Sequence, residues 1–340
     1  MTEQAEQQPN MTAAGMLKAM EKSSDGTNVL RETIQTMKMS DGKTVKGDVL
    51  LPIANIKGVA LTELWKLVEA AKASGKKGSA KWEFRTSPHA QFGMSLDDTL
   101  IAFLAWARVG SDDEPDTPGE NEGGDGQMTN VSKAFRRLEA YADWMESTGD
   151  DLVEPPLSGA SVVEPLKVWT IQASYDATDR LVWWIDLGKL DNDAFKTLPA
   201  EQSLRALTWF MHAVMYDAKA QQNGCVIVEN LAQLSFWKGM TLVPMKLSVK
   251  LDRLTIGVAP VKMKLFLCLD TPAWMSALMR LFGTFMSKKM MKRMVLLKKD
   301  WGRAAEVCGG VEFVPTGYGE CGGTLTADPV LDPLFGRVSR

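Results

Sequence analysis

Hydrophobic residues recur at helical spacing in three stretches of the first half of the chain. The first stretch covers 61–73 and stops at a Ser-Gly pair, which is typical of a helix end. The second begins after Ser95, whose hydroxyl is a favoured N-cap, and it ends near Gly110. The third covers about 131–147. Together these stretches predict a small helical unit.

Two other segments of this half show no such periodicity. Residues 110–130 contain seven acidic residues, five glycines and two prolines, so they cannot bury enough apolar surface to become ordered. We expect a flexible loop there. Residues 1–60 are expected to form a mobile or poorly defined amino-terminal extension.

Short apolar runs alternate with helical patterns from about residue 160 onward. We predict strands at 168–175, 181–187, 225–229, 261–269 and 294–297. The first two strands are joined by a short connection and should be antiparallel, whereas a long helix over 201–222 leads into the third. The pattern therefore predicts an α/β fold with a mixed sheet and helical crossovers.

An unusually apolar segment follows the fourth predicted strand. Trp274, Leu278, Phe282 and Phe285 recur at helical spacing, and three methionines extend the apolar surface around them. Such a helix is either part of the core or a lid over an apolar space. The pattern alone leaves both interpretations open.

Length and composition favour a globular protein outside the membrane. The 340 residues are 45% hydrophobic, which is ample for a core, and no secretory signal or apolar run of membrane-spanning length is seen. Four scattered cysteines, without the close pairs of a zinc site, favour a reducing cytosol and no metal. We therefore expect a soluble cytoplasmic protein.

Charge is distributed unevenly along the chain. Residues 238–303 hold fourteen Lys or Arg against three Asp, a net charge of +11, whereas the total of −3 leaves −14 for the remainder. A basic region of this kind indicates a polyanionic partner, either nucleic acid or an anionic membrane. The basic residues alternate with methionines, not with aromatic stacking residues, and no helix-turn-helix or zinc motif is present. We therefore expect a membrane surface and no nucleic acid.

Six segments, in order, resemble the CRAL-TRIO family of lipid-binding and lipid-transfer proteins. They are "DDTLIAFLAWAR" at 97–108, "VSKAFRRLEAYADW" at 131–144, "YDATDRLVWWIDL" at 175–187, "NGCVIVENLAQLS" at 223–235, "VKMKLFLCLDTPAWMSALMRLFGTFMSKKMMKRMVLL" at 261–297 and "VPTGYGECGGTL" at 314–325. The family includes carriers of tocopherol, retinaldehyde and phosphatidylinositol. The order of these weak motifs carries the resemblance.

The resemblance implies a helical domain followed by a mixed sheet whose flanking helices enclose an apolar cavity. We accordingly place the helical domain at 61–150, the lipid-binding domain at 160–327 and a carboxy-terminal tail at 328–340. It also implies that the helix beginning near Trp274 is a gate over the cavity. The cargo would be one hydrophobic lipid, moved between membranes or presented at them.

Apolar residues of the strands and of the gate are the candidates for lining the cavity. They are Tyr175, Trp183, Ile185, Ile227, Leu265, Leu267, Trp274, Leu278, Phe282 and Phe285. Burial of each CH₂ contributes about 0.8 kcal/mol, so such a lining could compete with a bilayer for a lipid chain.

Basic residues after the gate are the candidates for docking on an anionic membrane. Lys289 and Arg293 stand where the resemblance implies contact with phosphoinositide head groups, and Lys288 and Lys292 add to the charge. Basic residues also stabilise a helix C-terminus, so part of this charge could be structural.

Catalysis is not expected. The glycine-rich stretch 309–323 lacks the Gly-Lys-Ser/Thr of a phosphate loop, and no nucleophile elbow or paired carboxylates stand out. His212 lies in a predicted helix and is more typical of packing than of a base. We expect no catalytic residues, no cofactor and a monomer that associates reversibly with membranes. The alternative is a module that senses lipid or binds a protein without transferring cargo.

Overall fold

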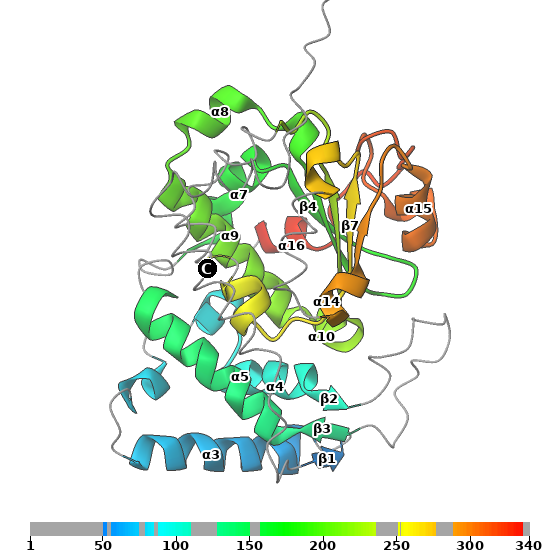
Figure 1. Cartoon of the computed structure of the whole chain (residues 1–340). Coiled ribbons are helices and arrows are strands. Elements are labelled where there is room, and N and C mark those ends of the chain that lie inside the picture. Colours follow the sequence, from blue (N-terminus) through cyan, green and yellow to red (C-terminus); the bar gives the residue numbers. More distant parts are fainter. Residues whose placement is uncertain are drawn as a thin grey trace, which may run out of the picture.

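The computed structural model describes residues 50–52, 56–74, 79–84, 88–109, 128–149, 157–235, 251, 253–276 and 288–335. Its amino-terminal part contains three principal helices, α3 (Leu61–Ala73), α4 (Leu96–Trp106) and α5 (Val131–Trp144) (Figure 1). Short helical segments accompany them at Ile56–Ala60, Ser79–Glu83, Pro88–Phe92 and Met145–Gly149. The three predicted helices are thus confirmed, the first with the predicted bounds.

Side-chain caps fix where two of these helices begin. The Asp98 amide donates to the Ser95 hydroxyl at 3.2 Å, and the Ser95 amide donates to the Asp98 carboxylate at 2.8 Å. This reciprocal pair satisfies amide groups that a helix start leaves open. Asn130 caps α5 in the same way, accepting from the Lys133 amide at 2.8 Å.

A small antiparallel sheet closes the helical unit at one end. Its strands are β1 (Leu50–Pro52), β2 (Arg108–Val109) and β3 (Met128–Asn130), in the order β1-β3-β2. We expected β1 to be part of the poorly defined extension at 1–60, because three residues are too few to show the alternation of apolar and polar side chains that indicates a strand.

The main sheet has five strands in the order β4-β5-β6-β7-β8. These are β4 (Ile171–Tyr175), β5 (Leu181–Asp186), β6 (Cys225–Asn230), β7 (Met263–Leu269) and β8 (Met294–Leu296). β4 and β5 are antiparallel, whereas the remaining neighbours are parallel. The mixed α/β sheet predicted from the sequence is confirmed.

Helices cover both faces of this sheet (Figure 1). The longer ones are α7 (Gly159–Val168), α9 (Ala200–Tyr216) and α15 (Gly302–Cys308). The shorter ones are α8 (Asn192–Thr197), α10 (Ala218–Asn223), α14 (Lys288–Arg293) and α16 (Leu331–Phe335), with turns at Leu187–Lys189, Arg253–Val258 and Val311–Phe313. Helices α7, α9 and α16 lie on one side of the sheet and α15 on the other.

Alternation of side chains divides the sheet residues between these two sides. Leu181 and Trp183 belong to the core shared with α9, whereas Val182 and Trp184 belong to a second cluster shared with α15. We call the first side the inner face and the second the outer face.

A bulge in β7 changes which residues reach each face. Cys225 pairs with Met263, but its neighbour Val226 pairs with Leu265, so Lys264 is an extra residue in the strand. Met263 therefore lies on the inner face together with Phe266. Strict alternation along the strand would place Met263 on the same face as Leu265, but alternation fails across a bulge.

Residues on both sides of the predicted lipid-binding domain at 160–327 are ordered. Ser158, just before it, caps α7 by accepting from the Ser161 amide at 3.2 Å. In the expected tail, Asp328 accepts from the Ala173 amide at 2.7 Å, and the Phe335 ring stacks on Trp209 at 5.9 Å.

The helical unit and the sheet domain share one hydrophobic core through α9. Tyr216 of α9 is hydrogen bonded to Thr99 of α4 at 2.9 Å, and His212 is hydrogen bonded to Tyr141 of α5 at 2.8 Å. His212 Nδ1 faces the Thr208 carbonyl at 2.7 Å, so Nδ1 donates and Nε2 accepts from the Tyr141 hydroxyl. Burial lowers the pKa of His212 to about 4.

This depressed pKa predicts a loss of stability in mild acid. The unfolded histidine takes up a proton near its usual pKa of 6.5, while the folded one resists until about 4, so the free energy of unfolding should fall across that interval. His212→Gln should remove roughly 1 to 3 kcal/mol of this fall, measured by urea unfolding at pH 7 and pH 4.5.

His89→Gln is the matched control, because burial also lowers the pKa of His89 but its side chain is only partly buried. It should change the pH dependence less. A His212→Gln protein whose stability falls with pH as the wild type does would contradict the prediction.

Candidate functional site

Apolar side chains form almost all of the inner face of the sheet. The paired strands place there Ile171, Ala173, Tyr175, Leu181, Trp183, Ile185, Cys225, Ile227, Glu229, Met263, Phe266, Cys268, Met294 and Leu296. Glu229 is the one carboxylate that the described strands direct to this face, since Asp186 lies on the outer face and interacts with Gly319.

Glu229 lies near the carboxyl end of β6, the middle strand of the sheet. It pairs in register with Ile185 on β5 and with Cys268 on β7, so its closest strand neighbours on this face are a methyl-rich side chain and a thiol. Burial raises the pKa of the Glu229 carboxyl to about 7. Burial, and secondarily the charge of Glu229, raises the pKa of the Cys268 thiol above its usual range.

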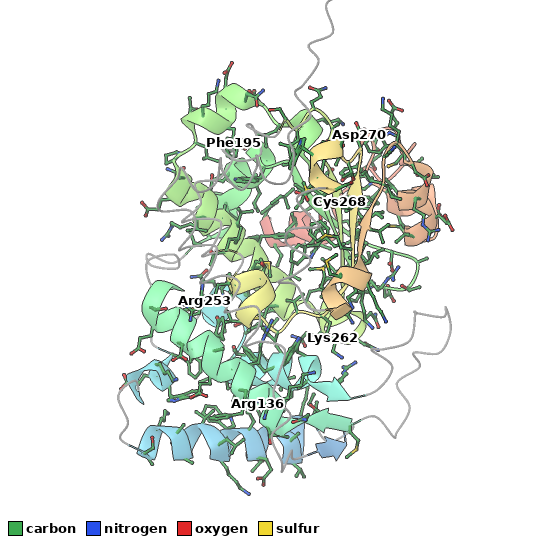
Figure 2. The ribbon with its side chains drawn as sticks, viewed as in Figure 1. Arg136, Phe195, Arg253, Lys262, Cys268 and Asp270 are labelled. Atoms are coloured by element: carbon green, nitrogen blue, oxygen red, sulfur yellow. The ribbon has the colours of Figure 1, made fainter. Side chains whose placement is uncertain are left out.

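A hydrophobic cluster surrounds this row at the carboxyl ends of the strands. We call it the strand-end cluster; it contains Ile185, Leu187, Leu190, Phe195, Leu231, Leu234, Phe266, Cys268, Trp274, Met275 and Leu296. Phe195 comes from α8 on the helical side, and Cys268 from the sheet (Figure 2). The cluster thus connects the helical layer to the sheet around Glu229.

Two tryptophans border this cluster. Trp274 is partly buried and donates its indole N–H to the Leu234 carbonyl at 3.2 Å. Trp169 meets Phe195 edge to face at 5.0 Å, and its indole nitrogen is buried without a hydrogen-bond partner. A buried N–H without an acceptor costs free energy, so a ligand oxygen there would be favourable.

The predicted lining residues on the inner face have different surroundings. Ile185 and Trp274 belong to the strand-end cluster, and Ile185 pairs in register with Glu229. Trp183 packs edge to face on Phe210 of α9 at 5.3 Å, and Ile227 is buried in the same core. These last two side chains are therefore part of the packing between sheet and helix.

Tyr175 lies at the end of β4, where its hydroxyl donates to the Asp217 carboxylate at 2.6 Å. The Lys219 ammonium lies 4.2 Å from the centre of its ring. Asp217 also caps α10 by accepting from the Ala220 amide. The long helix predicted over 201–222 is therefore two helices, and the first of them, α9, ends at Tyr216. The structure thus gives Tyr175 a role in joining β4 to α10.

Two other predicted lining residues lie on the outer face. Leu267 and Leu265 pack with the cluster that includes Ala304 and Cys308 of α15. They cannot share a lining with Trp183, because the sheet separates them. Leu278, Phe282 and Phe285, predicted for the gate, lie outside the described residues.

Sequence reasoning missed Glu229, Phe195 and Cys268 as site residues. An acidic residue inside an otherwise apolar strand was the available signal for Glu229. Phe195 carried no such signal, because its approach to the sheet depends on where α8 packs.

The predicted basic residues flank β8. Lys292 is exposed in α14, and the Arg293 guanidinium donates to the Met263 carbonyl at 2.7 Å, which ties α14 to the start of β7. Lys262 lies at this same end of β7, and Asp270 marks the opposite end (Figure 2). The exposed Lys298 and Lys299 follow β8 and therefore lie toward the Asp270 end.

Residues 167–316 match the family model of the CRAL/TRIO domain. This match agrees with the resemblance seen in the sequence, and a CRAL/TRIO domain supports lipid binding or transfer in general. A solved structure entitled "Crystal structure of Sfh5" is 14% identical and has a TM-score of 0.41, covering 60% of this chain and 73% of that chain. No curated protein matches the chain.

The part of the chain that the structure describes holds neither a metal-binding cluster nor a membrane-spanning helix. Within it, no group of three or more His, Cys, Asp or Glu side chains is arranged to hold a metal ion. No described helix is long and apolar enough to cross a membrane.

The raised pKa of Glu229 predicts that its charge destabilises the fold. An unfolded Glu ionises near 4.5 and the folded one near 7, so wild-type stability should fall as the pH rises through this interval. Glu229→Gln should therefore be more stable than wild type at pH 8, by roughly 1 to 3 kcal/mol, and not at pH 4.

Urea unfolding at the two pH values measures this difference. Glu306→Gln is the control, since Glu306 is exposed on α15. Equal differences between Glu229→Gln and wild type at both pH values would disprove the assignment.

Proposed function

We propose that the protein binds one hydrophobic lipid against the inner face of the sheet, beside the strand-end cluster, and transfers or presents it at membranes. The observation that supports this most directly is the apolar inner face of the sheet in the region that matches the CRAL/TRIO domain, with one carboxylate near the carboxyl end of its middle strand. The apolar surface buried against the lipid would provide the affinity. The few polar groups of the site would determine which lipid is bound.

The lipid would be held between layers that the structure describes. Ile185 and Phe266 lie on the sheet side, and Phe195 and Trp274 lie on other segments of the same cluster. All four are only partly buried, unlike the core residues that pack against α9. Partly buried apolar side chains in one cluster are the surface that a lipid chain would cover.

Lipid binding can be tested with a matched pair of variants. Wild-type protein should carry a co-purified lipid in native mass spectrometry and extract lipid from vesicles. Ile185→Gln should reduce extraction about tenfold, because it replaces apolar contact with a polar side chain.

Leu265→Gln is the control. Leu265 is also partly buried on a central strand, but it lies on the outer face. Repeated absence of lipid from the wild type, with no uptake from vesicles, would refute the proposed function. Equal losses in both variants would refute the proposed position of the lipid.

Docking would use the positive charge at the α14 end of the sheet. Lys288, Lys289 and Lys292 belong to α14, and Arg293 holds that helix to β7 through the Met263 carbonyl. Each Lys near an anionic leaflet contributes about 1 kcal/mol, so this end would attract a phosphoinositide-containing membrane. Arg293 would then act through the position of α14 as well as through its charge.

A charge-matched comparison tests this docking. Lys289→Ala with Lys292→Ala should weaken binding to vesicles containing phosphatidylinositol phosphate by roughly ten- to thirtyfold. Lys298→Ala with Lys299→Ala removes the same charge from the other end of β8 and should have a smaller effect. Equal effects in sedimentation assays would show that net charge, and not this end of the sheet, determines binding.

A second assay distinguishes a protein that transfers lipid from one that only senses it. A carrier moves labelled lipid between two vesicle populations at a rate that increases with protein concentration. A sensor or protein-interaction module would bind the lipid and leave this rate unchanged.

A further inference from the structure

Glu229 is a carboxylic acid on a surface that otherwise suits hydrocarbon. Its neighbours in register are Ile185 and Cys268, and the next pairs along the strands place Trp183 and Phe266 on the same face. Leucine or isoleucine at this position would complete an apolar floor. The acid therefore needs an explanation other than packing.

Burial is the one cause of the raised pKa of Glu229, and no cation in the part of the chain that the structure describes offsets it. Arg293, at the other end of β7, donates to the Met263 carbonyl. An ionised carboxyl on an apolar surface is costly, so a ligand that donates a hydrogen bond to it would gain free energy that hydrocarbon cannot.

The sign of the charge restricts what that ligand can be. A fatty acid or a phosphate placed beside Glu229 would bring a second negative charge into an apolar space, where like charges repel strongly. A hydroxyl can donate a hydrogen bond to the carboxylate without adding charge. The unpartnered indole N–H of Trp169, packed against Phe195, could donate to the oxygen of such a group.

On the basis of the proposed function, we infer that the cargo is an uncharged lipid bearing a hydroxyl group, and that Glu229 accepts the hydrogen bond from that hydroxyl and excludes lipids with an anionic group at this depth. Glu229 is thus a specificity-determining residue. The membrane-facing end of the protein plays no part in this selection.

The inference is tested by competition between two probes with the same chain length. Vesicles of phosphatidylcholine carry equal amounts of labelled 1-hexadecanol and palmitate at pH 8, and the protein is re-isolated and its lipid quantified by mass spectrometry. The measured quantity is the ratio of alcohol to acid extracted.

This ratio should fall about tenfold from wild type to Glu229→Leu, because the alcohol loses its acceptor and the acid loses its repulsion. Glu229→Gln keeps a hydrogen-bonding group of the same shape and removes the charge, so its ratio should lie between the two. Ile227→Leu, on the same strand and face, should keep the wild-type ratio.

Each result distinguishes this inference from the proposed function. If wild type and Glu229→Leu extract both probes in the same ratio, the role of Glu229 is refuted while lipid binding stands. If wild type extracts neither probe, lipid binding itself fails. If Glu229→Leu does not fold, an unchanged ratio in Glu229→Gln refutes the inference.

Discussion

The burial of helix α9 between two structural layers is the constraint on which the rest of the molecule depends. Nearly all of its residues from Ser203 to Tyr216 are buried, so both sides of the helix must be covered. The sheet covers one side, where Trp183 meets Phe210. Helices α4 and α5 cover the other side through the hydrogen bonds of Tyr216 and His212. The amino-terminal helices are therefore needed to complete the core of the sheet domain.

The position of α9 also determines which part of the inner face can serve a ligand. Where α9 packs on Trp183, the sheet is filled by protein side chains. The next row, Ile185, Glu229 and Cys268, borders the strand-end cluster instead. Ile185 and Phe266 are only partly buried there, and no charge among the described residues offsets the effect of burial on the pKa of Glu229. One part of the inner face is therefore filled by the side chains of α9, whereas the row with Glu229 borders the strand-end cluster.

The outer face is closed by the segment that follows α15. Tyr318 meets Trp184 edge to face at 4.9 Å and donates to the carbonyls of Ile185 and Val228. These bonds hold the segment against the backbone of the same strands that carry Glu229. The outer face is consequently filled by protein side chains, and Leu265 and Leu267 pack in the hydrophobic cluster there.

The sequence by itself determined the elements whose signals are local. The helix at Leu61–Ala73, the Ser95 cap and the five strands of the mixed sheet follow from periods of 3.6 and two residues and from capping chemistry. Only the tertiary structure decided the face of Met263, the ordering of the segment around Asp328 and the isolation of Glu229. The bulge in β7 exists only in relation to its partner strand β6. The hydrogen bond of Asp328 joins it to Ala173, which is far away in the sequence. The raised pKa of Glu229 depends on all the segments that surround its carboxyl. Those partners are distant in sequence, so no local pattern could contain them.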